Sequence, residues 1–216
     1  MYKHGEFLTV ENYHTFKEKM ESFDLLMFRG DDIISDAIAE IQTDDQFSHT
    51  GLVIHPNLLP GYNLEPDRLY VFESTYSYNI EGMDNGPPDY ITGERFFGVQ
   101  IRDLETVCTS YLHNDKTKIS WFALKRRPHV ANFVHTFTRY HRRPFLSCEI
   151  VPVVNLRQIT PDIMLMAKSI INATIIRTIL QSSFSCVNLV TSIYIDLGLI
   201  SAQTSILYPI ELLHLT

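Results

Sequence analysis

Cysteine is scarce in this chain: its 216 residues include three, Cys108, Cys148 and Cys186. An odd number of widely spaced cysteines cannot build a disulfide framework, and the lack of a Cys-x-x-Cys pair argues against a structural zinc site. Histidines recur every six residues at 129, 135 and 141, a spacing that does not stack side chains on one helical face. We therefore expect free thiols, no metal, no cofactor and a reducing compartment, the cytoplasm.

Positive charge is also limited. Eighteen Lys and Arg residues stand against 25 Asp and Glu residues, which gives a formal net charge of −7 at pH 7. This balance excludes a basic nucleic-acid coat, so we expect no nucleic-acid partner. One cluster of basic residues remains. It is either a solvated face or a binding site for an anionic membrane surface, phosphate or RNA. Its residues are Lys125, Arg126, Arg127, Arg139, Arg142 and Arg143.

Long apolar runs are absent. The N-terminal MYKHGEFLTV has neither a long apolar region nor a small-residue cleavage site, so we expect no secretory signal. The longest uncharged stretch, 178–195, is interrupted by Gln, Asn, Ser and Thr, whereas a membrane span needs about 20 predominantly apolar residues. With 45% hydrophobic and 12% aromatic residues, the composition predicts one soluble domain over 1–216.

The hydrophobic pattern predicts an α+β chain whose strands lie in its first 125 residues. Apolar and β-branched runs predict strands at 23–28, 49–54, 69–75, 97–101 and 119–124. Helical spacings with caps predict helices at 9–20, 33–41, 128–140, 161–180 and about 185–197. Gly and Pro punctuate 76–96, which we interpret as a loop that could act as a flap over a site, and 150–180 as a helical insertion.

Cys186 stands at the start of the last of these helices. A thiol in a first helical turn feels the positive end of the helix dipole, which favours the nucleophilic thiolate. The alternative is a small buried hydrophobic residue, which suits Cys108 and Cys148 better, since both lie in strand-edge or loop context. Apolar residues follow Cys186 at helical spacings and can pack on a core: Leu189, Val190, Ile193 and Leu197.

His49 opens the strand HTGLVI, and Glu73 interrupts an apolar run on the next strand, which we expect to pair with it. A strand holds an imidazole in one orientation, as a general base requires. A carboxylate on the second ring nitrogen would fix the tautomer and stabilise the imidazolium. Taken singly, His49 is more simply a half-buried histidine, and Glu73 is more simply a solvated strand glutamate.

Several short blocks together resemble the permuted NlpC/P60-like, papain-like proteins, the YiiX-like branch related to the lecithin–retinol acyltransferases. In that group a strand ends in Gly-Asp, a Ser-containing helix follows, and Ser-His precedes the next strand. The corresponding blocks here are Gly30-Asp31, 35–38, Ser48-His49, VFEST with Glu73, FSCVNLVTSIYIDLGLI with Cys186, and SILYPIELLHL. The chain departs from the pattern at Val187-Asn188, where the family has Ser-Glu, at Phe145, where it has Tyr, and in the insertion at 150–180.

The resemblance implies a circularly permuted papain-like fold, in which a small antiparallel sheet packs on helices and the cysteine helix lies near the C-terminus. It implies acyl transfer through a triad: Cys186 attacks a carbonyl, His49 moves the proton, and Glu73 orients His49. The backbone N–H of Cys186 is an available oxyanion donor. Because viruses carry members of this permuted group, the compartment would be the host cytoplasm if the chain is viral.

Three functions follow as alternatives. The first is a thiol hydrolase of amide, isopeptide or peptide bonds in a peptide or protein conjugate. The second is a lipid acyltransferase or acyl hydrolase with the same triad, and the third a non-catalytic host-interaction or binding module. Substrate contacts are expected from Ser48, Tyr76 and Tyr78, with Tyr90 further along the same loop.

Overall fold

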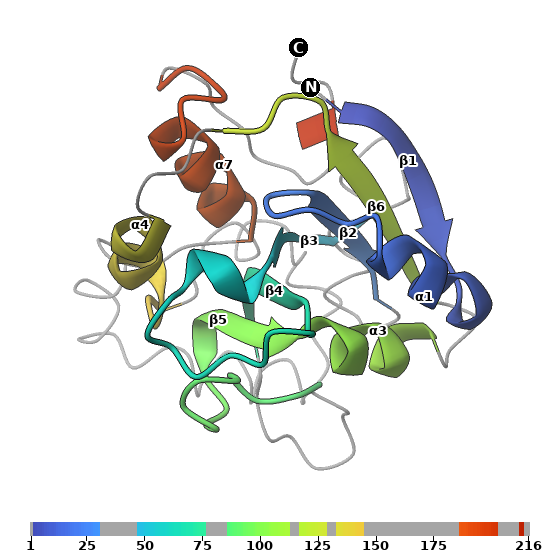
Figure 1. The fold of residues 1–216 in the computed structure, drawn as a ribbon, viewed down its shortest axis with the longest axis horizontal. Helices are drawn as coiled ribbons and strands as arrows, with labels where there is room; N and C mark the ends of the chain where they lie inside the picture. Colours follow the sequence, from blue (N-terminus) through green and yellow to red (C-terminus); the bar gives the residue numbers. More distant parts are fainter. Residues whose placement is uncertain are drawn as a thin grey trace, which may run out of the picture.

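The computed structural model describes residues 2–30, 47–76, 86–112, 117–128, 133–144, 186–202 and 212–213. They form an α+β fold around a six-stranded antiparallel sheet of order β1-β6-β2-β3-β4-β5 (Figure 1). The strands are β1 (Tyr2–Leu8), β2 (Leu25–Arg29), β3 (His49–Ile54), β4 (Tyr70–Tyr76), β5 (Phe97–Asp103) and β6 (Lys118–Leu124). The helices are α1 (Val10–Lys17), α3 (Leu104–Leu112), α4 (Phe133–Tyr140) and α7 (Cys186–Asp196), with a 3-10 turn η1 (Pro56–Leu58).

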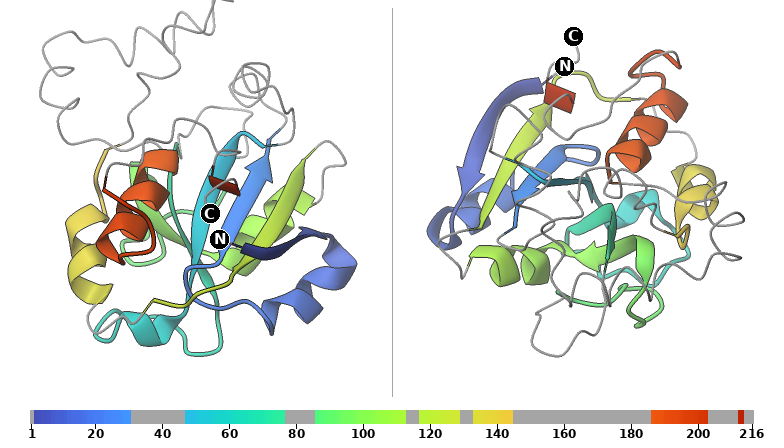
Figure 2. Two further views of the ribbon diagram at one scale, coloured as in Figure 1. Left: turned by 90° about the horizontal axis from the view of Figure 1, so that it is seen from above. Right: turned by 180° about the vertical axis from the view of Figure 1, so that it is seen from behind.

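Helices cover both faces of the sheet (Figure 2). On one face, Leu52 and Phe72 pack in a core with Phe137 of α4 and Leu189 of α7. On the other face, Val71 and its neighbours pack with residues of α1 and α3. This division follows from the alternation of side chains along each strand. It brings α7, with Cys186 at its start, against the central strands.

Strand register determines which polar residues meet. Strands β2 to β5 follow one another as antiparallel neighbours, and β6 returns between β1 and β2. Gly51 lies opposite Glu73, and Val71 lies opposite Arg102. Directly opposed residues of an antiparallel pair project from the same face, as do residues two apart on one strand. His49, Glu73 and Arg102 therefore share the face that α1 and α3 cover.

Several predicted elements are confirmed. The strand at 49–54 has the predicted bounds, and α1 begins after Thr9, which forms a capping box with Asn12. The helix α7 is described over Cys186–Asp196, within the predicted helix, and is followed by Gly198 in a left-handed conformation, φ +66°. The predicted helices at 33–41 and 161–180, and the insertion at 150–180, lie outside the described residues.

The strand β1 and the helix α3 were not predicted. The strand β1 contains Gly5 and charged residues, and it owes its conformation to pairing with β6. The interpretation of Cys108 as a strand-edge or loop residue is wrong, because Cys108 lies in α3 and is buried. Asp103 caps this helix by accepting hydrogen bonds from the backbone N–H and hydroxyl of Thr106.

Candidate active site

Glu73 is fully buried in the middle of β4. Its Oε2 lies 2.5 Å from Nε2 of His49, the first residue of β3. Gly51 stands opposite Glu73, and a Cβ on Gly51 would lie 2.6 Å from Val71 Cγ2 and 3.1 Å from Glu73 Cβ. The glycine therefore keeps this face open where histidine and glutamate meet. The predicted pairing of these two residues across adjacent strands is confirmed.

Arg102 is the residue that sequence reasoning missed. Its guanidinium, 5% exposed, places Nε and Nη2 at 2.6 and 2.5 Å from Glu73 Oε1. Burial alone would raise the pKa of Glu73, but Arg102 and His49 together hold that pKa below its ordinary value. Both carboxylate oxygens are thus engaged, one by a fixed cation and one by the imidazole.

Cys186 reaches the same histidine from the other side. It is 8% exposed, and its thiol lies near enough to His49 to act on the pKa of that histidine. Burial lowers the pKa of His49, but Cys186 and Glu73 outweigh it and raise the pKa to about 9. Since Nε2 faces Glu73, Nδ1 is the nitrogen available to the thiol. The structure therefore brings together Cys186, His49 and Glu73, as predicted.

The order of groups is Arg102, Glu73, His49 and Cys186, which alternates in charge when His49 is an imidazolium and Cys186 a thiolate. Compared with models of known protein families and with curated proteins, this chain matches none. A buried nucleophile, a base and a carboxylate in line are what acyl transfer by cysteine requires.

Of the three residues predicted to contact substrate, the structure describes Ser48 and Tyr76. Ser48 is buried, and its hydroxyl lies 3.4 Å from the backbone N of Gly30 and 3.5 Å from the carbonyl oxygen of Phe28, so it faces the end of β2. Tyr76 ends β4, and Tyr78 and Cys148 lie outside the described residues. Substrate binding by Ser48, Tyr76 and Tyr78 stays a prediction.

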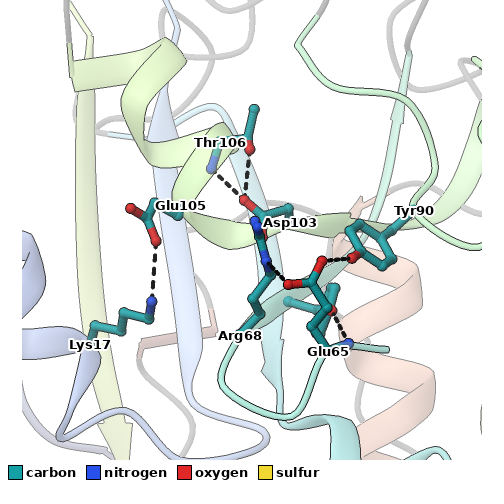
Figure 3. A network of polar contacts seen from close by, with 8 residues as sticks. Lys17, Glu65, Arg68, Tyr90, Asp103, Glu105 and Thr106 are labelled. Carbon is teal, nitrogen blue, oxygen red and sulfur yellow. Dashed lines mark hydrogen bonds and ion pairs between the residues drawn. The ribbon is translucent and has the colours of Figure 1, made fainter. Parts of the chain in front are cut away.

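The described part of the predicted flap, 86–96, follows the outer edge of β5. Tyr90 donates a hydrogen bond from its backbone N to Ile101 O and from its hydroxyl to Glu65 Oε1. Figure 3 shows Glu65 between Tyr90 and Arg68, while Arg68 also reaches Asp103. Tyr70, whose ring packs on that of Tyr90, begins β4 and pairs with Ile54 at the end of β3, whereas His49 is the first residue of β3. Tyr90 is thus directed away from His49.

The basic residues are partly engaged within the fold. Arg127 pairs with the buried Asp24 and with Glu21, and Arg142 pairs with Glu94 and covers the Phe96 ring. Arg143 donates to a backbone carbonyl, while Lys125 and Arg126 are exposed. Binding of an anionic membrane surface stays a prediction, with Lys125 and Arg126 its most accessible charges.

In the described part of the chain, no cluster of three or more His, Cys, Asp and Glu side chains is arranged to hold a metal ion. No helix there has the length and apolar character needed to cross a bilayer. Cys108, on α3, is buried beside Glu73 of β4. Burial, and then the nearby carboxylates, raise the pKa of its thiol, which disfavours the nucleophilic form.

Proposed function

We propose that this chain is a cysteine-nucleophile hydrolase that cleaves an amide, isopeptide or peptide bond through Cys186, His49 and Glu73. The observation that supports it is the position of His49, between a carboxylate on Nε2 and a thiol on its other side. An imidazolium beside a thiol favours the thiolate, and the pKa of about 9 for His49 makes imidazolium the main form at neutral pH.

The reaction would proceed in two halves. The Cys186 thiolate attacks the carbonyl carbon, and the backbone N–H at the start of α7 donates to the oxyanion. His49 then gives its proton to the leaving nitrogen, the C–N bond breaks, and a thioester remains. Water attacks the thioester while His49 takes a proton from it, the C–S bond breaks, and the carboxylic acid leaves as the thiolate and imidazolium are restored.

We further propose a circularly permuted papain-like arrangement for the fold. The chain order His49, Glu73, Cys186 supports it, since papain-like proteins in the unpermuted order have the cysteine first. An antiparallel sheet that carries the histidine and carboxylate, with the cysteine at the start of a helix packed on it, is the arrangement that the resemblance predicts.

Labelling by a thiol-directed probe tests the proposed function. A low concentration of an iodoacetamide probe should modify Cys186 in the native protein faster than a cysteine in a model peptide, as mapped by mass spectrometry. Cys186→Ala should abolish this fast labelling, whereas Cys108→Ser is the matched control and should keep it. Labelling that persists in Cys186→Ala, or that is no faster than the model peptide, contradicts the proposal and favours a non-catalytic module.

Substrate assays separate the two enzyme classes. Incubation of native protein and Cys186→Ala with a peptide-amide library and, separately, with acyl-lipid esters gives the substrate class. Cysteine-dependent release from peptides supports the hydrolase, and release from lipid esters alone supports the acyltransferase instead.

A further inference from the structure

Arg102 is a buried charged group that the reaction above does not use. Two of its three nitrogens point to Glu73 Oε1, at 2.6 Å from Nε and 2.5 Å from Nη2. Because Oε1 is held in this way, the carboxylate cannot rotate freely, and Oε2 stays directed at His49 Nε2. A planar guanidinium fixes a carboxylate in orientation as well as in charge.

Arg102 also balances the buried charge of the site. Without it, an imidazolium at His49 would already neutralise Glu73, and a thiolate at Cys186 would be an unbalanced buried charge, which is costly. With Arg102 present, the thiolate–imidazolium form of the whole row is neutral. From α3, the titratable group that faces Glu73 is Cys108, whose raised thiol pKa leaves it uncharged.

The third nitrogen of Arg102 meets the backbone of the segment 86–96. Nη1 lies 3.5 Å from the carbonyl oxygen of Pro87. Gly86 approaches even more closely, because a Cβ on it would lie 2.6 Å from Nη1, and its φ is +65°. Arg95 in turn donates to the carbonyl of Gly86 at 2.6 Å. Glycine is thus required at position 86 both by its backbone conformation and by the guanidinium.

We propose that Arg102 is a positioning residue, which orients Glu73 toward His49 and transmits the conformation of Gly86 and Pro87 to the candidate active site. This inference rests on the proposed function of Cys186 and His49. According to this inference, the segment 86–96 affects the reactivity of Cys186 through Arg102 and Glu73.

Two pairs of variants test the inference. Gly86→Ala places a methyl group against Arg102, whereas Gly93→Ala has the same kind of strain, φ +69°, with no atom within 4 Å. Arg102→Gln removes the buried cation, whereas Arg68→Gln removes an ion-paired arginine, 41% exposed, that contacts neither Glu73 nor His49 in the bonds described. The readouts are the alkylation rate of Cys186 by iodoacetamide at pH 6.5 and the NMR titration of His49.

We expect Gly86→Ala and Arg102→Gln to slow alkylation about tenfold, since small displacements of positioned groups have effects of this size. Arg102→Gln should also move the His49 titration down, toward the ordinary histidine value, because Glu73 is no longer held against Nε2 and supports the imidazolium less. If Glu73 kept its place without Arg102, loss of the positive charge alone would move the titration up. Should Arg102→Gln not fold, the Gly86 and Gly93 pair decides.

The outcomes separate the two proposals. If native Cys186 reacts no faster than a model peptide, the proposed function fails. If native Cys186 reacts fast and both test variants match their controls, the proposed function stands and the inference on Arg102 is overturned. An upward shift of the His49 titration in Arg102→Gln also overturns it, because Glu73 would then keep its place without Arg102.

Discussion

Two histidine–carboxylate pairs lie at the same sheet, and they differ in what surrounds them. His49 Nε2 is 2.5 Å from Glu73 Oε2, and His141 Nε2 is 2.8 Å from Asp89 Oδ2. Both carboxylates are fully buried, and the two imidazoles are 15% and 11% exposed. Distance and burial alone therefore do not distinguish a candidate active site from a structural contact.

The remaining partners do distinguish them. Asp89 accepts hydrogen bonds from the backbone N of Ile101 and of Thr92, so it fastens the segment 86–96 to β5. The ring of His141 stacks on Phe137, at 4.7 Å between centroids. In the other pair, Arg102 holds the carboxylate and a thiol acts on the histidine. A histidine–carboxylate pair becomes a candidate for chemistry when a nucleophile stands at its second nitrogen.

Loss of charge at the two carboxylates should have the largest effect on stability. Glu73→Gln leaves the buried Arg102 without its counter-ion, which we expect to cost about 3–5 kcal/mol of unfolding free energy. Asp89→Asn faces backbone N–H groups and a histidine, so a smaller cost of about 1–3 kcal/mol follows from its mismatched amide. Urea denaturation of both variants beside the native protein measures the difference.

The double variant Glu73→Gln/Arg102→Met provides the control. It removes the cation along with the carboxylate, so it should recover part of the loss seen in Glu73→Gln. Equal costs for Glu73→Gln and Asp89→Asn would show that the two pairs are alike, and would remove the electrostatic distinction drawn between them.

Replacement of the two histidines should separate reactivity from structure. His49→Gln removes the group that acts on the thiol, and we expect alkylation of Cys186 at pH 7 to slow about 100-fold, or about 2.7 kcal/mol. His141→Gln keeps an amide donor for Asp89 and should change that rate by less than about twofold. Iodoacetamide kinetics with mass-spectrometric mapping of Cys186 provide both rates. A comparable slowing in both variants contradicts the assignment of His49.

The sequence predicted the central parts of the fold from local patterns. HTGLVI is rich in β-forming residues and is stopped by Pro56, and Thr9 with Asn12 forms a cap that no distant contact needs to complete. The strand β1 and the helix α3 were missed because their stability comes from tertiary contacts, the pairing of β1 with β6 and the packing of α3 on the sheet. In α3, Leu104, Val107 and Cys108 are buried at helical spacings. Asp103, three residues before Thr106, was the helix-cap signal that the sequence offered.

The site was predictable as far as its motif residues extend. Cys186, His49 and Glu73 each stand at a recognisable place in an element, and their order along the chain is informative. Arg102 gave no such sign, because alternation in VQIRD normally sends an arginine to solvent, and its burial depends on the register of β4 and β5. The contact of His141 with Asp89 joins residues 52 apart and could not be deduced from either neighbourhood.

The pH dependence of stability should show a smaller difference between the pairs. His49 has its pKa raised from an ordinary value near 6.5 to about 9, so its stabilising contribution is complete below pH 6.5 and is lost as the pH rises through 9. Glu73 and Asp89 have lowered pKa values, so their contributions are complete above their ordinary values and are lost as the pH falls.

The acid loss is therefore common to both pairs, and the alkaline loss identifies the pair with the thiol. Between pH 6 and pH 8 we expect His49 to account for a fall of about 2 kcal/mol in unfolding free energy. His49→Gln should remove this fall, Cys186→Ala should reduce it because the thiol helps to raise the pKa of His49, and His141→Gln should leave it in place. Urea denaturation at the two pH values measures each change. An alkaline fall that disappears only in His141→Gln would reverse the assignment of the two histidines, since the proton lost near pH 9 would then belong to the pair without a nucleophile.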